Sequence, residues 1–267
     1  MRDLDQRSFD AVLWLTAGLA LVILTAPTVV VFITSFTASE SLRFPPSGLS
    51  WRWYVELLDS YDLQDMALRS LKIAAAAAAL ASVLGASAAL ALSRNQEGWA
   101  RAIDAFFMSP LIVPWIAIGL GILLLTSLAG LPASTGTLVA GHTVVGVPFV
   151  LRTTIASLSQ VDPALLQASQ SLGASPLYGF RRITLPLIAP GIAAGSFLAF
   201  IASFDNVPIS LFLADARSPV LPIRLWQMIQ ADLDPRVASI SAVIVVFTLV
   251  LMLAMERIAG LSRQLAR

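Results

Sequence analysis

Residues 162–186 read DPALLQASQSLGASPLYGFRRITLP, a polar segment that separates two long apolar stretches. Asp162 can cap a helix whose first residue is Pro163, because an aspartate side chain accepts a backbone N–H and proline is favoured at that position. The helix is expected to end at Gly173, since glycine tolerates the left-handed backbone that terminates helices.

A second short helix is predicted from Ser175 and Pro176 by the same cap-then-proline pattern. Pro186 then opens the next apolar stretch. The second helix carries a bulky aromatic residue and two cations, which are Phe180, Arg181 and Arg182. Two short helices joined at a glycine, too polar to insert into lipid, are typical of an element that docks against a partner.

The composition of the whole chain places its remainder in a membrane. Hydrophobic residues make up 57% of the 267 residues, charged residues 12%, and the mean hydropathy is +0.82. Soluble domains are nearer half apolar and a quarter charged. The net charge of +1 gives no electrostatic reason to expect a nucleic-acid partner. We therefore predict an all-α integral membrane protein.

Six apolar stretches are long enough to cross a bilayer core, which takes roughly 20 residues. They form one predicted domain over 11–260, between a cytoplasmic N-terminus (1–10) and a cytoplasmic tail (261–267). The first stretch exceeds the roughly 7–15 apolar residues of a cleaved signal, so we expect it to be retained. The predicted spans are Ala11–Phe36, Leu68–Leu92, Ala102–Leu128, Thr137–Leu158, Leu187–Leu213 and Ala238–Ile258.

Cationic residues favour cytoplasmic N- and C-termini, because cytoplasmic loops carry an excess of Arg and Lys. With the N-terminus inside, ten cations lie on the cytoplasmic side and seven on the outer side. The inner set is Arg2, Arg7, Arg94, Arg101, Arg152, Arg181, Arg182, Arg257, Arg263 and Arg267. The outer set is Arg43, Arg52, Arg69, Lys72, Arg217, Arg224 and Arg236.

Two further segments have a predicted local structure. Amphipathic aromatic residues near Trp51–Leu58 favour either a short helix in the headgroup layer or an ordinary outer loop. The run Ala74–Ala79, followed by other small residues, favours a span packed inside a bundle, because small residues let helices approach closely in lipid. Compositional drift towards alanine is the alternative.

The residue inventory excludes most catalytic chemistry. The chain has no cysteine and one histidine, so neither a thiolate nor a histidine metal site is expected. Its one lysine, Lys72, is followed by Ile73, whereas a P-loop needs Gly-Lys-Ser/Thr to bind phosphates. We expect no enzyme activity, no metal and no cofactor of its own. Energy from ATP would have to come from another subunit.

The polar segment resembles the EAA loop of ABC-importer permeases, whose pattern is Glu-Ala-Ala, three residues, Gly, nine residues and Ile-x-Leu-Pro. Here Gly173 is followed by nine residues and then by Ile183-Thr184-Leu185-Pro186. Gln167 and Ser169 replace the glutamate and the second alanine of the pattern, and a glutamine can still hydrogen-bond but cannot supply the charge of the glutamate. In the family this loop forms the coupling helix, which sits in a groove of the ATPase subunit.

The resemblance implies ATPase-coupling roles for a set of loop residues. They are Gln167, Ala168, Ser169, Leu172, Gly173, Ala174, Ser175, Pro176, Phe180, Arg181 and Arg182. Other segments are similar to spermidine/putrescine-type permeases. These are Gly48–Tyr54, His142–Val144 with Pro148–Val150, and Ser203–Asn206 with Leu211–Leu213.

The implied architecture is a six-helix type I importer permease in the bacterial inner membrane. Two permease subunits, expected to be different chains, would each form half of the pathway. Two ABC ATPase subunits would bind ATP below them, and a separate binding protein would deliver the solute from outside. Closure of the ATPases would draw the coupling helices together and switch the pathway from inward- to outward-facing, a rigid-body mechanism.

Asp205 is the main candidate for contact with a passing solute, because an ionisable group at membrane depth is costly and commonly faces a cavity or partner. Ser203 and Asn206 flank it, and Pro208 removes a backbone donor where the helix could break. A structural ion pair near the outer end, to an arginine of the second permease, is the alternative. His142 is a further pathway candidate, with a helix–helix hydrogen bond as its competing role.

Polyamines are the leading substrate class by resemblance, with opines, other amino compounds and aminophosphonates as alternatives. An ATP-independent transporter or channel would typically show internal repeats or several intramembrane charges, which this sequence lacks. A membrane scaffold would not need a coupling loop. An intramembrane enzyme would need a catalytic set that is absent here.

Overall fold

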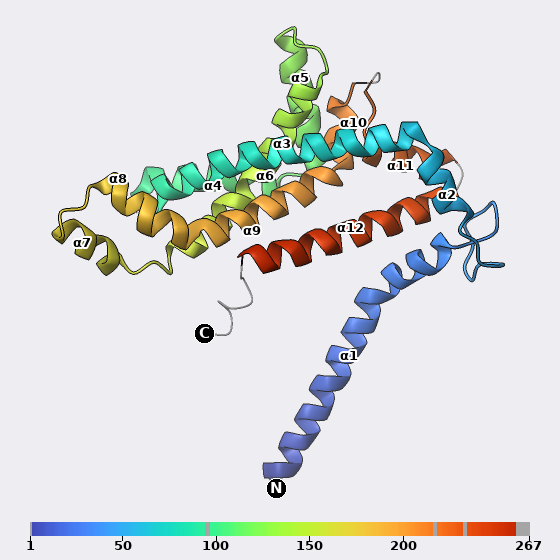
Figure 1. The fold of residues 1–267 in the computed structure, drawn as a ribbon, viewed down its shortest axis with the longest axis horizontal. Coiled ribbons are helices and arrows are strands. Elements are labelled where there is room, and N and C mark those ends of the chain that lie inside the picture. The colour runs from blue at the N-terminus through green and yellow to red at the C-terminus, as the bar shows by residue number, and fades with distance from the viewer. Residues whose placement is uncertain (1, 94–96, 216–217, 232–233, 260–267) are drawn as a thin grey trace. The chain divides into compact units, whose positions relative to one another are not determined.

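In the computed structural model, every named secondary-structure element of the described residues is a helix (Figure 1). It describes residues 2–93, 97–215, 218–231 and 234–259, with the side chains of 2–8 and 258–259 outside the description. The expected tail at 261–267 therefore lies outside the described residues. Six of the cationic residues used to predict the orientation also lie outside the description, either as whole residues or as side chains. They are Arg2, Arg7, Arg94, Arg217, Arg263 and Arg267.

The chain divides into two compact units. The first comprises 1–61 with 227–247, and the second comprises 62–226 with 248–267. The helices are α1 (Arg2–Ser35), α2 (Arg52–Asp59), α3 (Tyr61–Leu92), α4 (Gly98–Ile112), α5 (Trp115–Leu128), α6 (Thr135–Leu158), α7 (Pro163–Ser171), α8 (Pro176–Gly179), the π-helical segment η1 (Phe180–Thr184), α9 (Leu185–Phe204), α10 (Val207–Leu213), α11 (Leu221–Ala231) and α12 (Pro235–Ala259).

Five helices of the described chain are long and apolar enough to cross a membrane. They contain most of the predicted first, second, fourth, fifth and sixth spans. Their bounds are Phe9–Ser35, Tyr61–Leu92, Thr135–Leu158, Pro176–Phe204 and Pro235–Arg257. The bent pair α4 and α5 makes a sixth if its two helices form one span.

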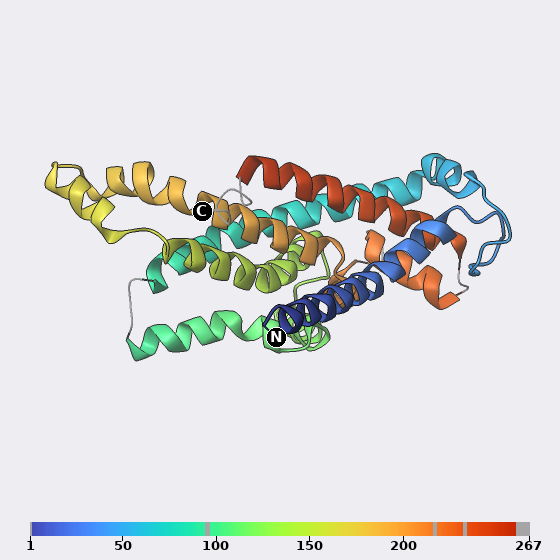
Figure 2. The ribbon, with the colours of Figure 1, turned by 90° about the horizontal axis from the view of Figure 1, so that it is seen from below.

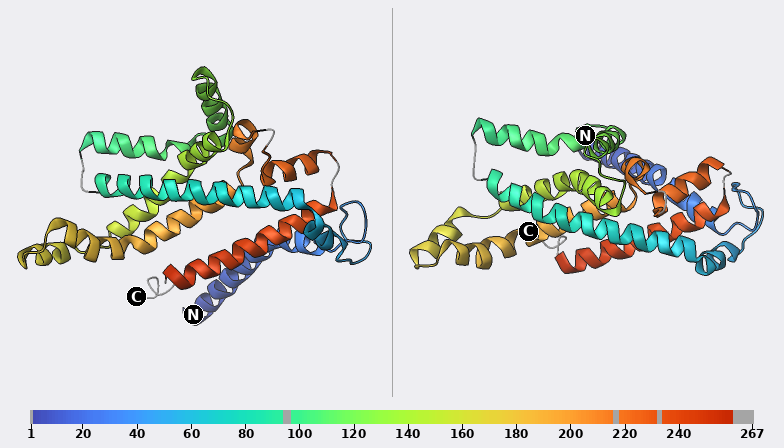
Figure 3. Two further views of the ribbon diagram at one scale, coloured as in Figure 1. Left: turned by 45° about the horizontal axis from the view of Figure 1, so that its top comes forward. Right: turned by 90° about the horizontal axis from the view of Figure 1, so that it is seen from above.

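The predicted span 102–128 consists of two helices in the structure. The helix direction bends by 107° between α4 and α5, and the green segments of Figure 3 show this change of direction. Val113 and Pro114 lie at the bend with extended backbone. Proline disfavours helical geometry at the residue before it, which accounts for the break at this point.

The predicted span 187–213 also differs from the structure, at both of its ends. Its helix begins earlier, because α8, η1 and α9 run on as one helix from Pro176 to Phe204. The second short helix expected in the polar segment is therefore the first turn of this long helix. After Phe204 the helix stops, and α10 begins at Val207.

A three-helix core of α3, α6 and α9 organises the second unit, and the three run side by side in Figures 1 and 2. Ala78 and Ala81 of α3 pack against Val147 and Val150 of α6 and Ala199 of α9. The prediction that the alanine-rich span packs inside a bundle is confirmed. Small residues make this close approach possible where lipid offers no hydrophobic driving force.

Two glycines of α9 permit its contact with α6. A Cβ atom built on Gly195 would lie 2.5 Å from the Val150 Cα atom, and one on Gly191 would lie 2.6 Å from the Thr153 carbonyl oxygen. The two glycines are four residues apart, the GxxxG spacing that lets helix backbones meet closely in membranes.

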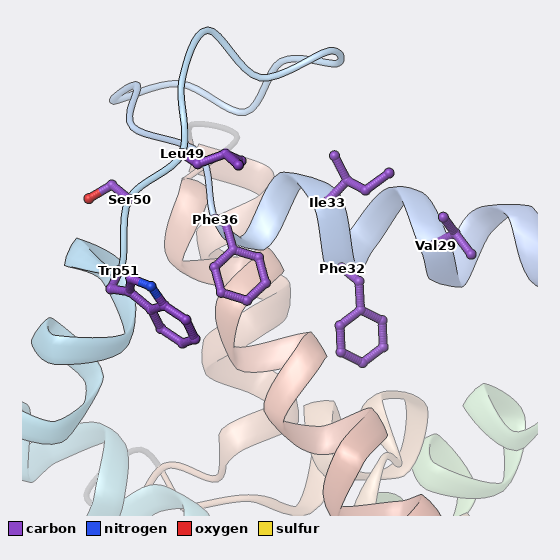
Figure 4. Close-up of a pocket in the computed structure, with 7 residues that line it drawn as sticks. All are labelled: Val29, Phe32, Ile33, Phe36, Leu49, Ser50 and Trp51. Carbon is purple, nitrogen blue, oxygen red and sulfur yellow. The ribbon is translucent and has the colours of Figure 1, made fainter.

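The first unit contains α1, the adjoining loop and α2, together with residues 227–247. The Trp53 indole N–H donates to the Thr37 carbonyl at 2.9 Å, and Phe36 packs edge-on against Trp51. A helix at 52–59 thus confirms the predicted short helix, whereas its place in the headgroup layer stays a prediction. Figure 4 shows an apolar groove of about 670 Å³ between this loop and α1, lined by Val29, Phe32, Ile33, Phe36, Leu49, Ser50 and Trp51.

Candidate functional site

The polar loop begins with a capped helix, as its sequence predicts. The Asp162 carboxylate accepts the Ala164 N–H at 2.8 Å, and none of the residues of α7 is buried. Gly173 has a φ of +83°, and its N–H donates to the Gln170 carbonyl at 2.9 Å. With the Ala174 N–H donating to the Ser169 carbonyl at 3.1 Å, the helix ends in a Schellman motif.

The restart at Ser175 also agrees with the prediction. The Ser175 hydroxyl accepts the Tyr178 N–H at 3.3 Å, with Pro176 at the first helical position. The next turn was not predicted, since the helix widens there into the π-helical segment η1 in front of Pro186. In this turn the Leu185 N–H donates to the Phe180 carbonyl, five residues back. The wider turn accommodates a proline that would clash with the carbonyl four residues before it.

The loop exposes apolar side chains together with cations. Leu172 is 89% exposed and Leu177 64% exposed, while Arg181 and Arg182 are exposed beside a concavity of about 570 Å³. Gln167 and Ala168 are exposed on α7, whereas Ser169 and Phe180 are half-buried. A second concavity of about 760 Å³ lies between α7, α8 and the end of α3, and Gln170 is among its lining residues. Exposed leucines on a short capped helix are suited to a protein partner.

The four pathway candidates meet where α9 gives way to α10. The Asn206 side chain accepts the Ile209 N–H at 2.8 Å and donates to the Ala202 carbonyl at 3.3 Å. It therefore caps α10 and ties it to the last turn of α9. The break lies at Asp205 and Asn206, three and two residues before Pro208, which occupies the first turn of α10.

His142 contacts both sides of this break. Its Nδ1 lies 2.7 Å from the Ser203 hydroxyl and its Nε2 lies 3.1 Å from the Ser210 hydroxyl. Both ring nitrogens are therefore occupied by helix–helix hydrogen bonds. The sequence analysis missed Ser210, although a buried histidine with two polar nitrogens signals that two partners are required.

Burial separates Asp205 from its neighbours. His142, Ser203 and Asn206 are each at most 3% exposed, whereas Asp205 is exposed. The cavity beside His142, Ser203 and Ser210 measures about 10 Å³, room for about one water molecule and not for a diamine. Of the four candidates Asp205 alone is exposed, and its carboxylate has no hydrogen bond or ion pair to another described residue.

Within the described residues no group of three or more His, Cys, Asp or Glu side chains could hold a metal ion. One further polar contact of the second unit was not foreseen. Arg152 of α6 pairs with Asp104 of α4 at 3.1 Å, and its Nε contacts the Met108 sulfur. This pair ties α4 to α6 and has no signal in the local sequence.

The chain resembles polyamine permeases over most of its length. It is 30% identical to the spermidine/putrescine transport system permease protein PotC of Escherichia coli (strain K12), over 87% of this chain and 88% of that protein. It is 34% identical to the putrescine transport system permease protein PotI of the same strain, over 83% and 81%. It is 29% identical to a putative 2-aminoethylphosphonate transport system permease protein, PhnV, of Salmonella typhimurium, over 80% and 81%.

Solved transporters share the fold. A bacterial ABC transporter involved in the import of the acidic polysaccharide alginate matches with a TM-score of 0.73 and 15% identity, over 97% of each chain. The inward-facing MetNI methionine ABC transporter matches with a TM-score of 0.62 and 18% identity, over 74% of this chain and 94% of that one.

The family model of binding-protein-dependent transport system inner membrane components matches residues 81–266, which include the loop and the helix break. This match, the relatives and the helical fold agree with one another. The chain therefore belongs to this family, as a multi-pass permease subunit of an ABC importer in the inner membrane.

Proposed function

We propose that this permease imports a small organic cation, a polyamine in the first instance, using ATP hydrolysed by separate subunits that dock on the loop at 162–186. One observation carries the proposal. A single helix runs from Pro176 in the exposed loop to Phe204 at the break beside Asp205. At about 1.5 Å per residue, this helix is about 43 Å long and joins the two candidate sites as one rod.

The loop supplies the docking surface. Leu165 and Leu172 of the α7 region and Leu177 of α8 are exposed, and their burial against a partner would remove apolar surface from water. Arg181 and Arg182 add exposed cations at the base of the same loop. Gln167 can hydrogen-bond to an ATPase subunit without contributing a charge. This surface supports coupling roles for the loop residues named above.

The long helix supplies the connection. Movement of the loop by the ATPase subunits would displace the start of the helix, and a continuous helix carries such a displacement along its axis. The π-helical turn at 180–184 lies within the loop, and π-turns inside helices are frequent at functional positions. The break at Asp205 and Asn206 is where the displacement would alter the pathway.

The break supplies the solute contact. Asp205 offers an exposed carboxylate with no ion pair to another described residue, and an ammonium group would satisfy it. The relatives are named for spermidine, putrescine and 2-aminoethylphosphonate, which all carry an amino group. The common amino group supports an amine cation as the substrate class, with Asp205 as its counter-ion.

The complete importer, in this proposal, holds a second permease, a different chain, to complete the pathway, with two ATPases on the cytoplasmic side and a binding protein outside. Both termini of this chain are cytoplasmic. The loop is then cytoplasmic, and the turn between α5 and α6 faces outward. His142, Ser203 and Asn206 shape the pathway from behind, since each is buried.

A cysteine crosslink tests the docking site, because the chain has no natural cysteine. Leu172→Cys places a thiol on the loop, and Leu128→Cys places one at the end of α5, where Leu128 is 87% exposed. We expect the first variant to capture an ATPase subunit in native membranes and the second to capture none. Equal capture by both, or by neither when the subunit is folded, would contradict the docking site.

The same two variants test the orientation. A membrane-impermeant maleimide added to intact spheroplasts should label Leu128→Cys at once and Leu172→Cys only after the membrane is permeabilised. The reverse order would invert the proposed topology.

A further inference from the structure

One side chain from a third helix, α6, bridges the break between α9 and α10. His142 of α6 contacts Ser203, in the last turn of α9, through Nδ1, and Ser210, in α10, through Nε2. The two serines lie on opposite sides of the two non-helical residues, Asp205 and Asn206. A single imidazole therefore holds both halves of the broken helix.

The imidazole has no remaining polar atom for another role. A neutral imidazole donates one hydrogen bond and accepts one, and the serine hydroxyls can serve as donor or acceptor. Both ring nitrogens are used, and the adjoining cavity of about 10 Å³ leaves no space for an organic solute. A buried nitrogen that lost its partner would be destabilised, so the two bonds constrain the ring and the serines together.

The helix that carries His142 is a fixed reference for both halves. On the α9 side, Gly195 brings α9 into backbone contact with α6. On the α10 side, a Cβ atom added at Gly141 would meet the side chains of Leu213 and Ile209, so α10 also packs directly on α6. His142 is next to Gly141 in the chain and contacts α9 at Ser203, in the last turn of that helix.

We propose that His142 is a positioning residue, which sets the angle between α9 and α10 and so the place at which Asp205 presents its carboxylate. This inference rests on the proposed passage of the solute past Asp205. Asn206 closes the break locally through its cap, whereas His142 fixes its direction relative to the rest of the core. Loss of one hydrogen bond loosens the angle and loss of both frees it, in each case without removing the carboxylate.

The angle can be measured with two spin labels on the same chain. Leu198→Cys on α9 and Leu211→Cys on α10 introduce thiols at positions that are 43% and 49% exposed, in a chain without other cysteines. The distance distribution between the labels, recorded by pulsed EPR on the whole reconstituted importer, reports the angle between the two helices.

In that background His142→Phe keeps a ring of similar size and removes both hydrogen bonds. We expect the distance distribution to broaden at least twofold or its maximum to shift by several Å. We also expect amine uptake per assembled complex to fall at least tenfold. Thr143→Val is the matched control, because Thr143 is the next buried polar residue of α6 and its hydroxyl bonds only to the Val139 carbonyl of its own helix. It should leave both measurements unchanged.

Partial replacements separate positioning from general destabilisation. An asparagine amide approximates the Nδ1 position and a glutamine amide the Nε2 position. His142→Asn should thus retain the Ser203 contact, and His142→Gln the Ser210 contact. Each should recover part of the uptake. Adding Ser203→Ala to His142→Phe should cause no further loss.

If His142→Phe fails to assemble, Ser203→Ala and Ser210→Ala carry the test, because each removes a single hydroxyl. Distance distributions and uptake that remain unchanged in these variants would overturn the positioning role. Failure of the proposed function would give a different result. Leu172→Cys would then form no crosslink to an ATPase subunit, and the unsubstituted protein would show no amine uptake.

Discussion

The loop at 162–186 and the break at 205–206 lie at the two ends of one helix, and they differ in whether their polar side chains are buried or exposed. Around the break, the polar side chains of His142, Ser203 and Asn206 bond to partners within the chain. The loop leaves most of its side chains exposed, and α7 buries none. A buried polar group needs a hydrogen-bond partner within the folded chain, whereas an exposed one can bond to water or to another subunit. Substitutions should therefore disturb folding near the break and assembly at the loop.

Asp205→Asn should have the largest effect, because Asp205 is the exception at its end of the helix. Its carboxylate is exposed, so the variant should fold and assemble normally. Loss of about 2 kcal/mol of charge pairing with an ammonium group would lower amine uptake about thirtyfold. Uptake of labelled putrescine into proteoliposomes measures the loss, and Asp205→Glu should restore much of it. Normal uptake by Asp205→Asn would move the solute contact elsewhere.

Gly195→Ala should come next, because it separates the helix that joins the two regions from α6. The added Cβ would lie 2.5 Å from the Val150 Cα atom and 3.0 Å from the Phe149 carbonyl oxygen. Overpacking of this kind costs about 1–3 kcal/mol. Thermal unfolding of the purified complex should show a lower Tm. Gly121→Ala in α5 is the control, since its Cβ would meet nothing within 4 Å.

Gly173→Ala tests the loop without touching the core. Gly173 has a φ of +83°, and the left-handed conformation costs a residue with a Cβ about 1–2 kcal/mol. ATP hydrolysis should become partly uncoupled from uptake, seen as more ATP consumed per solute. Gly130→Ala is a matched control at the α5–α6 turn, where φ is +69°. The same strain there should leave the coupling ratio unchanged, and an equal effect of both would deny the loop its role.

Gln167→Glu should have the smallest effect and the opposite sign. It restores the charge that the EAA pattern carries, at an exposed position where an ion pair contributes about 0.2–1 kcal/mol. Binding of the ATPase subunit should tighten by up to about fivefold in a titration at low salt. Gln170→Glu, in the concavity beside α3, should not reproduce the gain. Weaker binding of the ATPase subunit by Gln167→Glu would contradict the prediction that a charge at this position forms an ion pair with that subunit.

The local features of both regions were predictable because their causes are local. Asp162 and Ser175 cap helices through N–H groups two or three residues away, and Gly173 adopts a conformation that its own lack of a Cβ permits. Ser203, Asp205 and Asn206 lie together because they are neighbours in the sequence, whereas the contact of His142 with Ser203 was not predicted.

Long-range features were not predictable. The 107° bend between α4 and α5 has a local trigger in Pro114, but other prolines of the chain, such as Pro148, lie within a continuous helix. Whether a proline bends a helix depends on the neighbours that satisfy the freed carbonyl. Ser210 lies 68 residues from His142, and only the folded chain brings them together.

The sequence by itself determined that this protein belongs in lipid, which stretches are apolar enough to span it, how its loop is capped and which family it resembles, because hydropathy, capping and motif spacing act over a few residues. Tertiary structure alone decided which polar side chains are buried as partners and which carboxylate stays exposed. Those outcomes depend on how α3, α6 and α9 pack, and packing is set by contacts between residues far apart in the chain.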